Sequence, residues 1–193
     1  MAEGHEDWAL GYVDEVWWSR LAQPNMHAWC FGQDKPLRLM QKQKDKDEKE
    51  PVALACYGVW LVKRQQMLLR FVKGRPVSQV TTEFLDWVCG WLEAAGVRVW
   101  ALIWDNASWH KSQQVRRWIR GHNARVKATG GVRIVVCLLP VQSPWLNPIE
   151  PRWLHGKRAI VEPSRKLTVE EVIERVHAYY GCERLAPIAQ KTT

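Results

Sequence analysis

Three acidic side chains stand where a folded chain could bring them together. Asp14 ends a short apolar run near the start of the chain, and Asp105 ends a longer one. Glu150 lies in the sequence NPIEP, which is typical of a helix start because proline suits the first helical position. A carboxylate at the carboxyl end of a buried strand lies where α/β sheets bind ligands. The three acids are therefore candidates for one shared metal site.

Carboxylate groups at such a site would suit a particular kind of chemistry. Mg²⁺ and Mn²⁺ prefer hard oxygen ligands, and a few carboxylates leave room for water and a phosphate group. Two such ions about 3.5–4 Å apart can activate a nucleophile and stabilise the leaving oxygen in phosphodiester cleavage. The formal net charge of +8 suits a polyanionic partner. This combination favours metal-dependent chemistry on nucleic acid.

Each acid alone also has an ordinary structural explanation. Asp105 and Asn106 can begin a helix or turn, Asp14 can be a surface acid at a strand end, and Glu150 can cap a helix dipole. Glu15 points to the opposite face of a strand from Asp14, which makes it the less suitable partner. The pattern alone leaves these alternatives open.

Other polar and basic side chains lie close to these acids in the sequence. His110 follows Asp105 by five positions and could contact phosphate, act as a general acid or base, support a ligand, or simply cap a helix. The basic residues expected to track DNA phosphates are Arg116, Arg117, Arg120, Arg152, Lys157 and Arg158. For any single one of them, a solvated helix face is the simpler explanation.

Several functional classes lose their main support. The sequence contains no Walker loop, no GxGxxG, no GxSxG and no HExxH pattern. Its five cysteines are scattered without a CxxC pair, which argues against a cysteine zinc site and suits a reducing compartment. No apolar run approaches the roughly 18 residues of a membrane span, and no secretory signal is visible at the N-terminus. We therefore expect a cytoplasmic protein with no membrane partner.

The order of predicted elements indicates one α/β domain over residues 1–193, with a mixed central sheet flanked by helices. Strands are predicted at Trp8–Asp14, His27–Phe31, Leu37–Met40, Val52–Trp60, Met67–Val72, Val97–Trp104 and Val132–Leu139, the last as a buried strand. Helices are predicted at Thr81–Ala95, Ser112–His122, Pro151–Val161 and Thr168–Tyr180, with a basic loop at Asn123–Gly131. Thr168 and Glu171 have the spacing of a capping box.

Three motifs resemble those of the DDE transposases of bacterial insertion sequences, in the branch allied to the mariner elements. They are Tyr12-Val13-Asp14-Glu15, Trp104-Asp105-Asn106-Ala107-Ser108-Trp109-His110, and Ser143-Pro144-Trp145-Leu146-Asn147-Pro148-Ile149-Glu150. The resemblance covers the chain from about Trp8 to Tyr180. The second and third motifs together are much more specific than either one alone.

The resemblance implies a ribonuclease-H-like fold and a DNA transposase catalytic domain. It implies that Asp14, Asp105 and Glu150 are catalytic acids that bind two Mg²⁺ or Mn²⁺ ions, with supporting roles for Asn106, His110, Trp145 and Asn147. The implied reaction is cleavage at transposon ends, followed by joining of the 3′-hydroxyl to target DNA. Double-stranded DNA is then the partner, and a homodimer is expected on that DNA, in a bacterial cytoplasm beside the nucleoid.

Two features depart from the family pattern. The interval between Asp105 and Glu150 is longer than in many mariner relatives, and Asn123–Gly131 has the composition of an inserted loop. Relatives usually carry N-terminal helix-turn-helix modules, whereas here Asp14 comes almost at once. The chain therefore resembles a catalytic half: a fragment, a decayed copy, or one product of a split reading frame, for which a separate helix-turn-helix chain is a possible partner. Two alternatives remain open: a stand-alone nuclease of the same fold, and an inactive remnant that binds DNA.

Overall fold

The computed structural model describes residues 4–21, 49–141, 143–160 and 165–189. Its strands are β1 (Trp8–Ser19), β2 (Ala53–Leu61), β3 (Gln66–Lys73), β4 (Val99–Trp104), β5 (Arg133–Leu138) and the short β6 (Ile188–Ala189). Its α-helices are α1 (Ser78–Ala94), α2 (Gln113–Thr129), α3 (Ile149–Ile160) and α4 (Val169–Tyr180), and a 3-10 turn covers Pro144–Leu146. The strands predicted at His27–Phe31 and Leu37–Met40 lie outside the described residues.

The described strands form one mixed sheet in the order β5-β4-β1-β2-β3-β6. β1, β2 and β3 pair antiparallel, as the predicted meander requires. β4 pairs parallel with both β1 and β5, and the crossovers between them contain α1 and α2. β6, which sequence reasoning missed, adds two residues beside β3.

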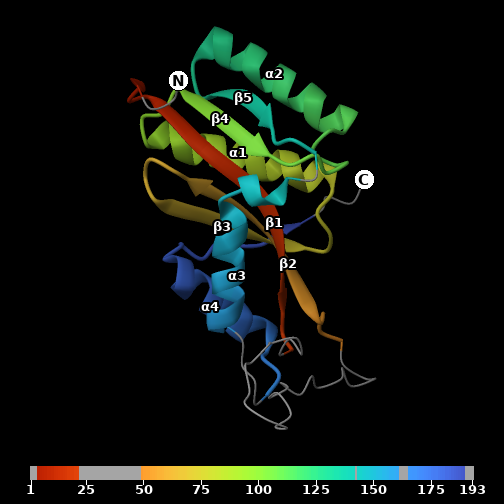
Figure 1. Ribbon diagram of the computed structural model, residues 1–193. Coiled ribbons are helices and arrows are strands. Elements are labelled where there is room, and N and C mark those ends of the chain that lie inside the picture. Colours follow the sequence, from red (N-terminus) through yellow and green to blue (C-terminus); the bar gives the residue numbers. More distant parts are fainter. Residues whose placement is uncertain (1–3, 22–48, 142, 161–164, 190–193) are drawn as a thin grey trace.

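Helices cover both faces of this sheet (Figure 1). On one face α1 and α2 pack over a core that includes Val13, Tyr57 and Trp100. On the other face α3 and α4 pack over a second core that includes Val16 and Trp18. Side chains alternate between the faces of a strand, so β1 contributes to both cores in turn. The predicted α/β architecture, a mixed sheet flanked by helices, is confirmed.

The capping box of α4 is confirmed as well. The Thr168 side chain accepts a hydrogen bond from the Glu171 backbone, and the Glu171 side chain accepts one from the Thr168 backbone. Gly181 ends the helix in a left-handed conformation with φ of 62°. None of the helices in the described part of the chain is long and apolar enough to cross a membrane.

Two predictions about the second half of the chain are wrong. Asn123–Gly131 is not a loop, because α2 continues to Thr129 and ends at glycines 130 and 131, both with positive φ. The Asn123 side chain helps to dock this extension, since it bonds both the backbone N–H and the carbonyl of Ile134. The strand at residues 133–138 is largely exposed rather than buried, because β5 lies at the edge of the sheet.

Candidate active site

One pocket brings the three predicted acids together. It has a volume of about 190 Å³. The side chains that line it are Asp14, Asp105, Asn106, Leu139, Pro140, Ser143, Asn147 and Glu150. The acids therefore reach one pocket from a strand, from the end of another strand and from the start of a helix.

The positions of Asp14 and Asp105 follow from the parallel pairing of β1 and β4. That pairing runs as far as Tyr12 opposite Ile103. Asp14 follows Tyr12 by two residues inside β1, and Asp105 follows Ile103 by two residues, directly after β4 ends at Trp104. Both acids therefore come just beyond the same end of the parallel pairing. This is where α/β sheets place their ligands.

Glu150 is held at the start of α3 by its neighbours. The buried side chain of Asn147 accepts a hydrogen bond from the Ile149 N–H at 3.4 Å. The backbone carbonyl of Asn147 accepts one from the Glu150 N–H at 3.1 Å. Ile149 is fully buried and fixes the first turn of the helix in the core. The Glu150 side chain is exposed and lines the pocket.

Asp14 is the most buried of the three acids, with 8% of its surface exposed. Its Oδ2 accepts a hydrogen bond from Trp153 Nε1 at 3.1 Å. Burial, together with the nearby negative charges of Glu150, Glu15 and Asp105, raises the pKa of Asp14 to about 8. Such a cluster of carboxylates is electrostatically unfavourable until a cation joins it.

Asp105 is held by donors on one oxygen. Its Oδ1 accepts hydrogen bonds from His110 Nδ1 at 2.8 Å and from the Ala107 N–H at 2.9 Å. The hydrogen bond from His110 lowers the pKa of Asp105 despite an opposing effect of burial. Burial alone would lower the pKa of His110, but its bonds to Asp105 and Glu15 outweigh that effect and raise it to about 9. Both ring nitrogens of the resulting imidazolium can donate.

Glu15 completes this arrangement from the other face of β1. Its Oε1 lies 2.8 Å from His110 Nε2 and accepts a second hydrogen bond from Trp109 Nε1 at 3.0 Å. Sequence reasoning placed Glu15 correctly on the face opposite Asp14 but missed this contact. The available signal was weak: an acid beside a site aspartate, and a histidine distant in the sequence.

The predicted supporting residues differ in their placement. Asn106 lines the pocket and donates from Nδ2 to the Leu139 carbonyl at 2.6 Å, which ties the loop after β4 to the loop after β5. Asn147 lines the pocket as well. His110 is buried behind Asp105, where it cannot meet substrate directly. Trp145 is 77% exposed and is not among the residues that line the pocket.

The predicted basic residues fall into two groups. Arg116 and Arg120 are exposed on α2 and, with Lys111, border a hollow next to His110 and Trp104. Arg117 is exposed on the same helix and donates to Gln113. On α3, Arg158 is exposed, Lys157 is half-buried, and Arg152 lies over the ring of Trp60 with 3.5 Å between the guanidinium carbon and the ring centroid. Arg152 therefore has a packing role of its own.

The chemistry of the pocket fits a divalent metal, although no ion site is fully formed. Its donors are three carboxylates, the hard oxygen ligands that Mg²⁺ and Mn²⁺ prefer. Among the described residues, no three His, Cys, Asp or Glu side chains are close enough together to hold one ion. Binding would thus require the carboxylates to come closer together than they lie here.

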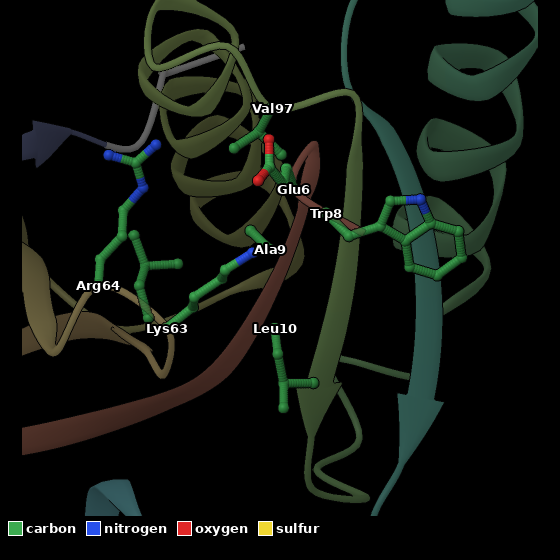
Figure 2. A pocket seen from close by; sticks show the side chains of 8 residues that line it. Glu6, Trp8, Ala9, Leu10, Lys63, Arg64 and Val97 are labelled. Carbon is green, nitrogen blue, oxygen red and sulfur yellow. The ribbon is translucent and has the colours of Figure 1, made fainter. Parts of the chain in front are cut away.

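A second cleft, at the opposite end of β1, has a different character. Glu6, Lys63 and Arg64 line it together with apolar side chains such as Val97 (Figure 2). Lys63 and Arg64 donate to backbone carbonyls, those of His5 at 3.4 Å and Ala95 at 2.9 Å. A single carboxylate among cations does not suit a metal, so the chemistry is expected at the first pocket.

Comparisons with known proteins show a family and a fold for this chain. Residues 14–173 match a family model described as DDE superfamily endonuclease. A Mos1 transposase paired-end complex with the left transposon end is similar with a TM-score of 0.63 and 14% identity, over 91% of this chain and 48% of that chain. The Mos1 mariner paired-end complex with Mg is similar with a TM-score of 0.60 and 14% identity, over 89% of this chain and 48% of that chain. The Mos1 strand transfer complex has a TM-score of 0.59 and 13% identity, over 91% of this chain and 48% of that chain.

These similarities establish the fold as ribonuclease-H-like, as the sequence resemblance implied. The chain spans about half the length of the Mos1 chains that it matches. No curated protein matches the chain at a significant level.

Proposed function

Since the chain belongs to the DDE superfamily endonucleases, we propose that it is the catalytic domain of a metal-dependent DNA transposase. Asp14, Asp105 and Glu150 are the proposed catalytic acids and metal ligands. The observation that carries the proposal is the single pocket that all three line from separate elements. Burial and the neighbouring acids raise the pKa of Asp14, and a bound cation would relieve this penalty on its ionised form.

In this proposal Asp14, Asp105 and Glu150 would hold Mg²⁺ or Mn²⁺, as two ions, which would supply activation of the attacking water or hydroxyl and stabilisation of the leaving oxygen. The protein's own contribution is to hold the ligands. Trp153 fixes the Asp14 carboxylate through its indole N–H, and Asn147 fixes the backbone that presents Glu150. Support for these metals comes from the oxygen-only donor set and from the Mos1 complexes described with Mg and with Mn.

The proposed substrate is double-stranded DNA, first the transposon ends and then the target. The Mos1 relatives are described as paired-end and strand transfer complexes, which supports cleavage followed by joining of a 3′-hydroxyl. The exposed arginines 116, 117 and 120 would contact phosphates beside the pocket. We further propose a homodimer on DNA, end recognition by a helix-turn-helix chain, and action beside the nucleoid of a bacterial cytoplasm.

A strand-transfer assay tests this function. Purified protein is given pre-cleaved ends from the repeats that flank its coding sequence, a plasmid target, and Mg²⁺ or Mn²⁺. We expect metal-dependent joining by the unchanged chain and none by Asp105→Asn. The matched control is Asp86→Asn, because Asp86 is an exposed acid on α1 away from the pocket.

The other outcomes identify the alternatives. Cleavage without joining indicates a stand-alone nuclease, and DNA binding without either reaction indicates an inactive remnant. Full activity of Asp105→Asn would refute the assignment of the three acids.

A further inference from the structure

A buried histidine links a carboxylate outside the pocket to one inside it. His110 lies with Nδ1 2.8 Å from Asp105 Oδ1 and Nε2 2.8 Å from Glu15 Oε1. The His110 side chain has no exposed surface, and that of Glu15 is 8% exposed. Two buried groups thus meet on the side of Asp105 that faces away from solvent.

The histidine ring is fixed in its plane as well as at its nitrogens. It stacks on the ring of Trp104 with centroids 4.4 Å apart and an angle of 8° between the planes. The Trp109 ring meets its edge at 5.9 Å, and the Trp109 N–H donates to the same Glu15 oxygen. Because the ring can neither tilt nor rotate freely, the position of Glu15 is transmitted to Asp105.

This arrangement leaves one Asp105 oxygen for the pocket. In the described structure the hydrogen bonds to Asp105 end on Oδ1, from His110 and from the Ala107 N–H. The Asp105 side chain is otherwise half-exposed, with 52% of its surface accessible. With Oδ1 held at the back, Oδ2 is the atom that can turn toward an ion.

Two adjacent residues of β1, Asp14 and Glu15, would then contribute to the same metal site in different ways. Asp14 faces α3 and lines the pocket directly, whereas Glu15 faces α1 and α2 and reaches Asp105 through His110. We propose that Glu15 is a positioning residue that orients the Asp105 carboxylate through His110. The proposal rests on the proposed metal site.

Hydrogen-bonded groups behind a metal ligand typically contribute 10- to 100-fold to metal affinity. We therefore expect Glu15→Ala and His110→Ala each to weaken Mn²⁺ binding by about that factor. Glu15→Gln keeps an oxygen that can accept from His110 Nε2 and Trp109 Nε1, so it should restore most of the affinity. Glu93→Ala, an exposed acid on α1, is the matched control and should bind as the unchanged chain does.

Isothermal titration with Mn²⁺ and no DNA measures this directly, at a temperature where circular dichroism shows each variant folded. If Glu15→Ala does not fold, Glu15→Asp replaces it, because the shorter side chain keeps the charge but cannot reach His110 in the same way. The double variant of Glu15 and His110 gives the decisive comparison. If Glu15 acts through His110, the double variant should bind Mn²⁺ no more weakly than His110→Ala alone.

The outcomes of this experiment distinguish the role of Glu15 from the proposed metal site itself. The role of Glu15 is overturned, with the metal site intact, if Asp105→Asn abolishes binding but Glu15→Ala leaves the Mn²⁺ affinity unchanged. It is also overturned if the losses of affinity in the two single variants multiply in the double variant. Failure of the unchanged chain to bind Mn²⁺, or unchanged binding by Asp105→Asn, would overturn the metal site itself.

Discussion

Asp14 and Gly58 lie opposite each other in the antiparallel pair of β1 and β2, and the ring of Trp153 occupies the space beside that glycine. A Cβ at position 58 would lie only 2.4 Å from Trp153 Cη2. The same indole donates to Asp14 through Nε1. The absence of a side chain at Gly58 is thus what allows α3 to dock with Glu150 at the pocket.

The first prediction concerns this contact. Gly58→Ala should push Trp153 away and lower the free energy of unfolding by about 1–3 kcal/mol, the usual cost of overpacking a core. Gly90→Ala is the control, because that glycine is inside α1 with open space around it. It should stabilise the protein by about 0.5–1 kcal/mol. Urea denaturation of both variants decides, and equal stability would contradict the packing account.

The second prediction concerns Asp14 in the absence of metal. The folded pKa of Asp14 is about 8, above the usual value of 3.8. Between about pH 4 and pH 8 the unfolded chain therefore loses this proton while the folded protein keeps it, and the free energy of unfolding falls as pH rises. Asp14→Asn removes that cost. In EDTA its stability advantage over the unchanged chain should therefore grow over this pH range, to the order of a few kcal/mol.

Added Mg²⁺ should reverse the order, because only the unchanged chain keeps the ligand. Its Tm should rise with Mg²⁺ and that of Asp14→Asn should not. A stability difference between the two proteins that does not depend on pH in EDTA would refute the raised pKa of Asp14, which burial and the clustered acids produce.

The third prediction concerns the start of α4. Glu171 accepts hydrogen bonds from Arg165 and from the Thr168 N–H, and these lower its pKa to about 2 from an ordinary value of 4.5. A lowered folded pKa stabilises above the unfolded pKa and loses that effect as pH falls through the folded one. Glu171→Gln should therefore cost stability above about pH 5, and the difference should disappear toward pH 2. Chemical denaturation at a series of pH values measures it.

The fourth prediction concerns DNA contacts beside the pocket. Arg116→Ala and Arg120→Ala should each reduce the slope of log K against log salt by about one. Arg64→Ala, in the cleft at the other end of β1, should leave the slope unchanged. Fluorescence anisotropy with a DNA duplex at several salt concentrations tests this. Equal slopes for all the variants would exclude α2 from the interface.

The sequence predicted the three acids because each ends an apolar run or begins a helix, although the strand expected to end at Asp14 continues to Ser19 in the structure. Asp14 and Asp105 became neighbours only through the parallel register of β1 and β4, which the alternation of apolar residues does not encode. The bond between Glu15 and His110 joins residues that are 95 positions apart, so local spacing could not reveal it. The same holds for Trp153, which reads as a core residue until α3 is docked over Gly58.

The errors have a similar physical origin. The apolar sequence of β5 does not show whether another strand or a helix packs against it. In the structure β5 is the edge strand of the sheet and is largely exposed. α2 runs past His122 because Asn123 bonds to Ile134, a tertiary contact that overrides the polar composition of the segment.

The alternation of Asp14 and Glu15 along β1 limits how this protein can change. Side chains repeat every two residues in a strand, so inserting or deleting one residue before Asp14 while the pairing with β4 is kept would exchange the two faces. The acid in the pocket and the acid behind His110 would both be misplaced by that single event. Changes in chain length should therefore be tolerated in the connections between strands and excluded from the short stretch between Trp8 and Asp14.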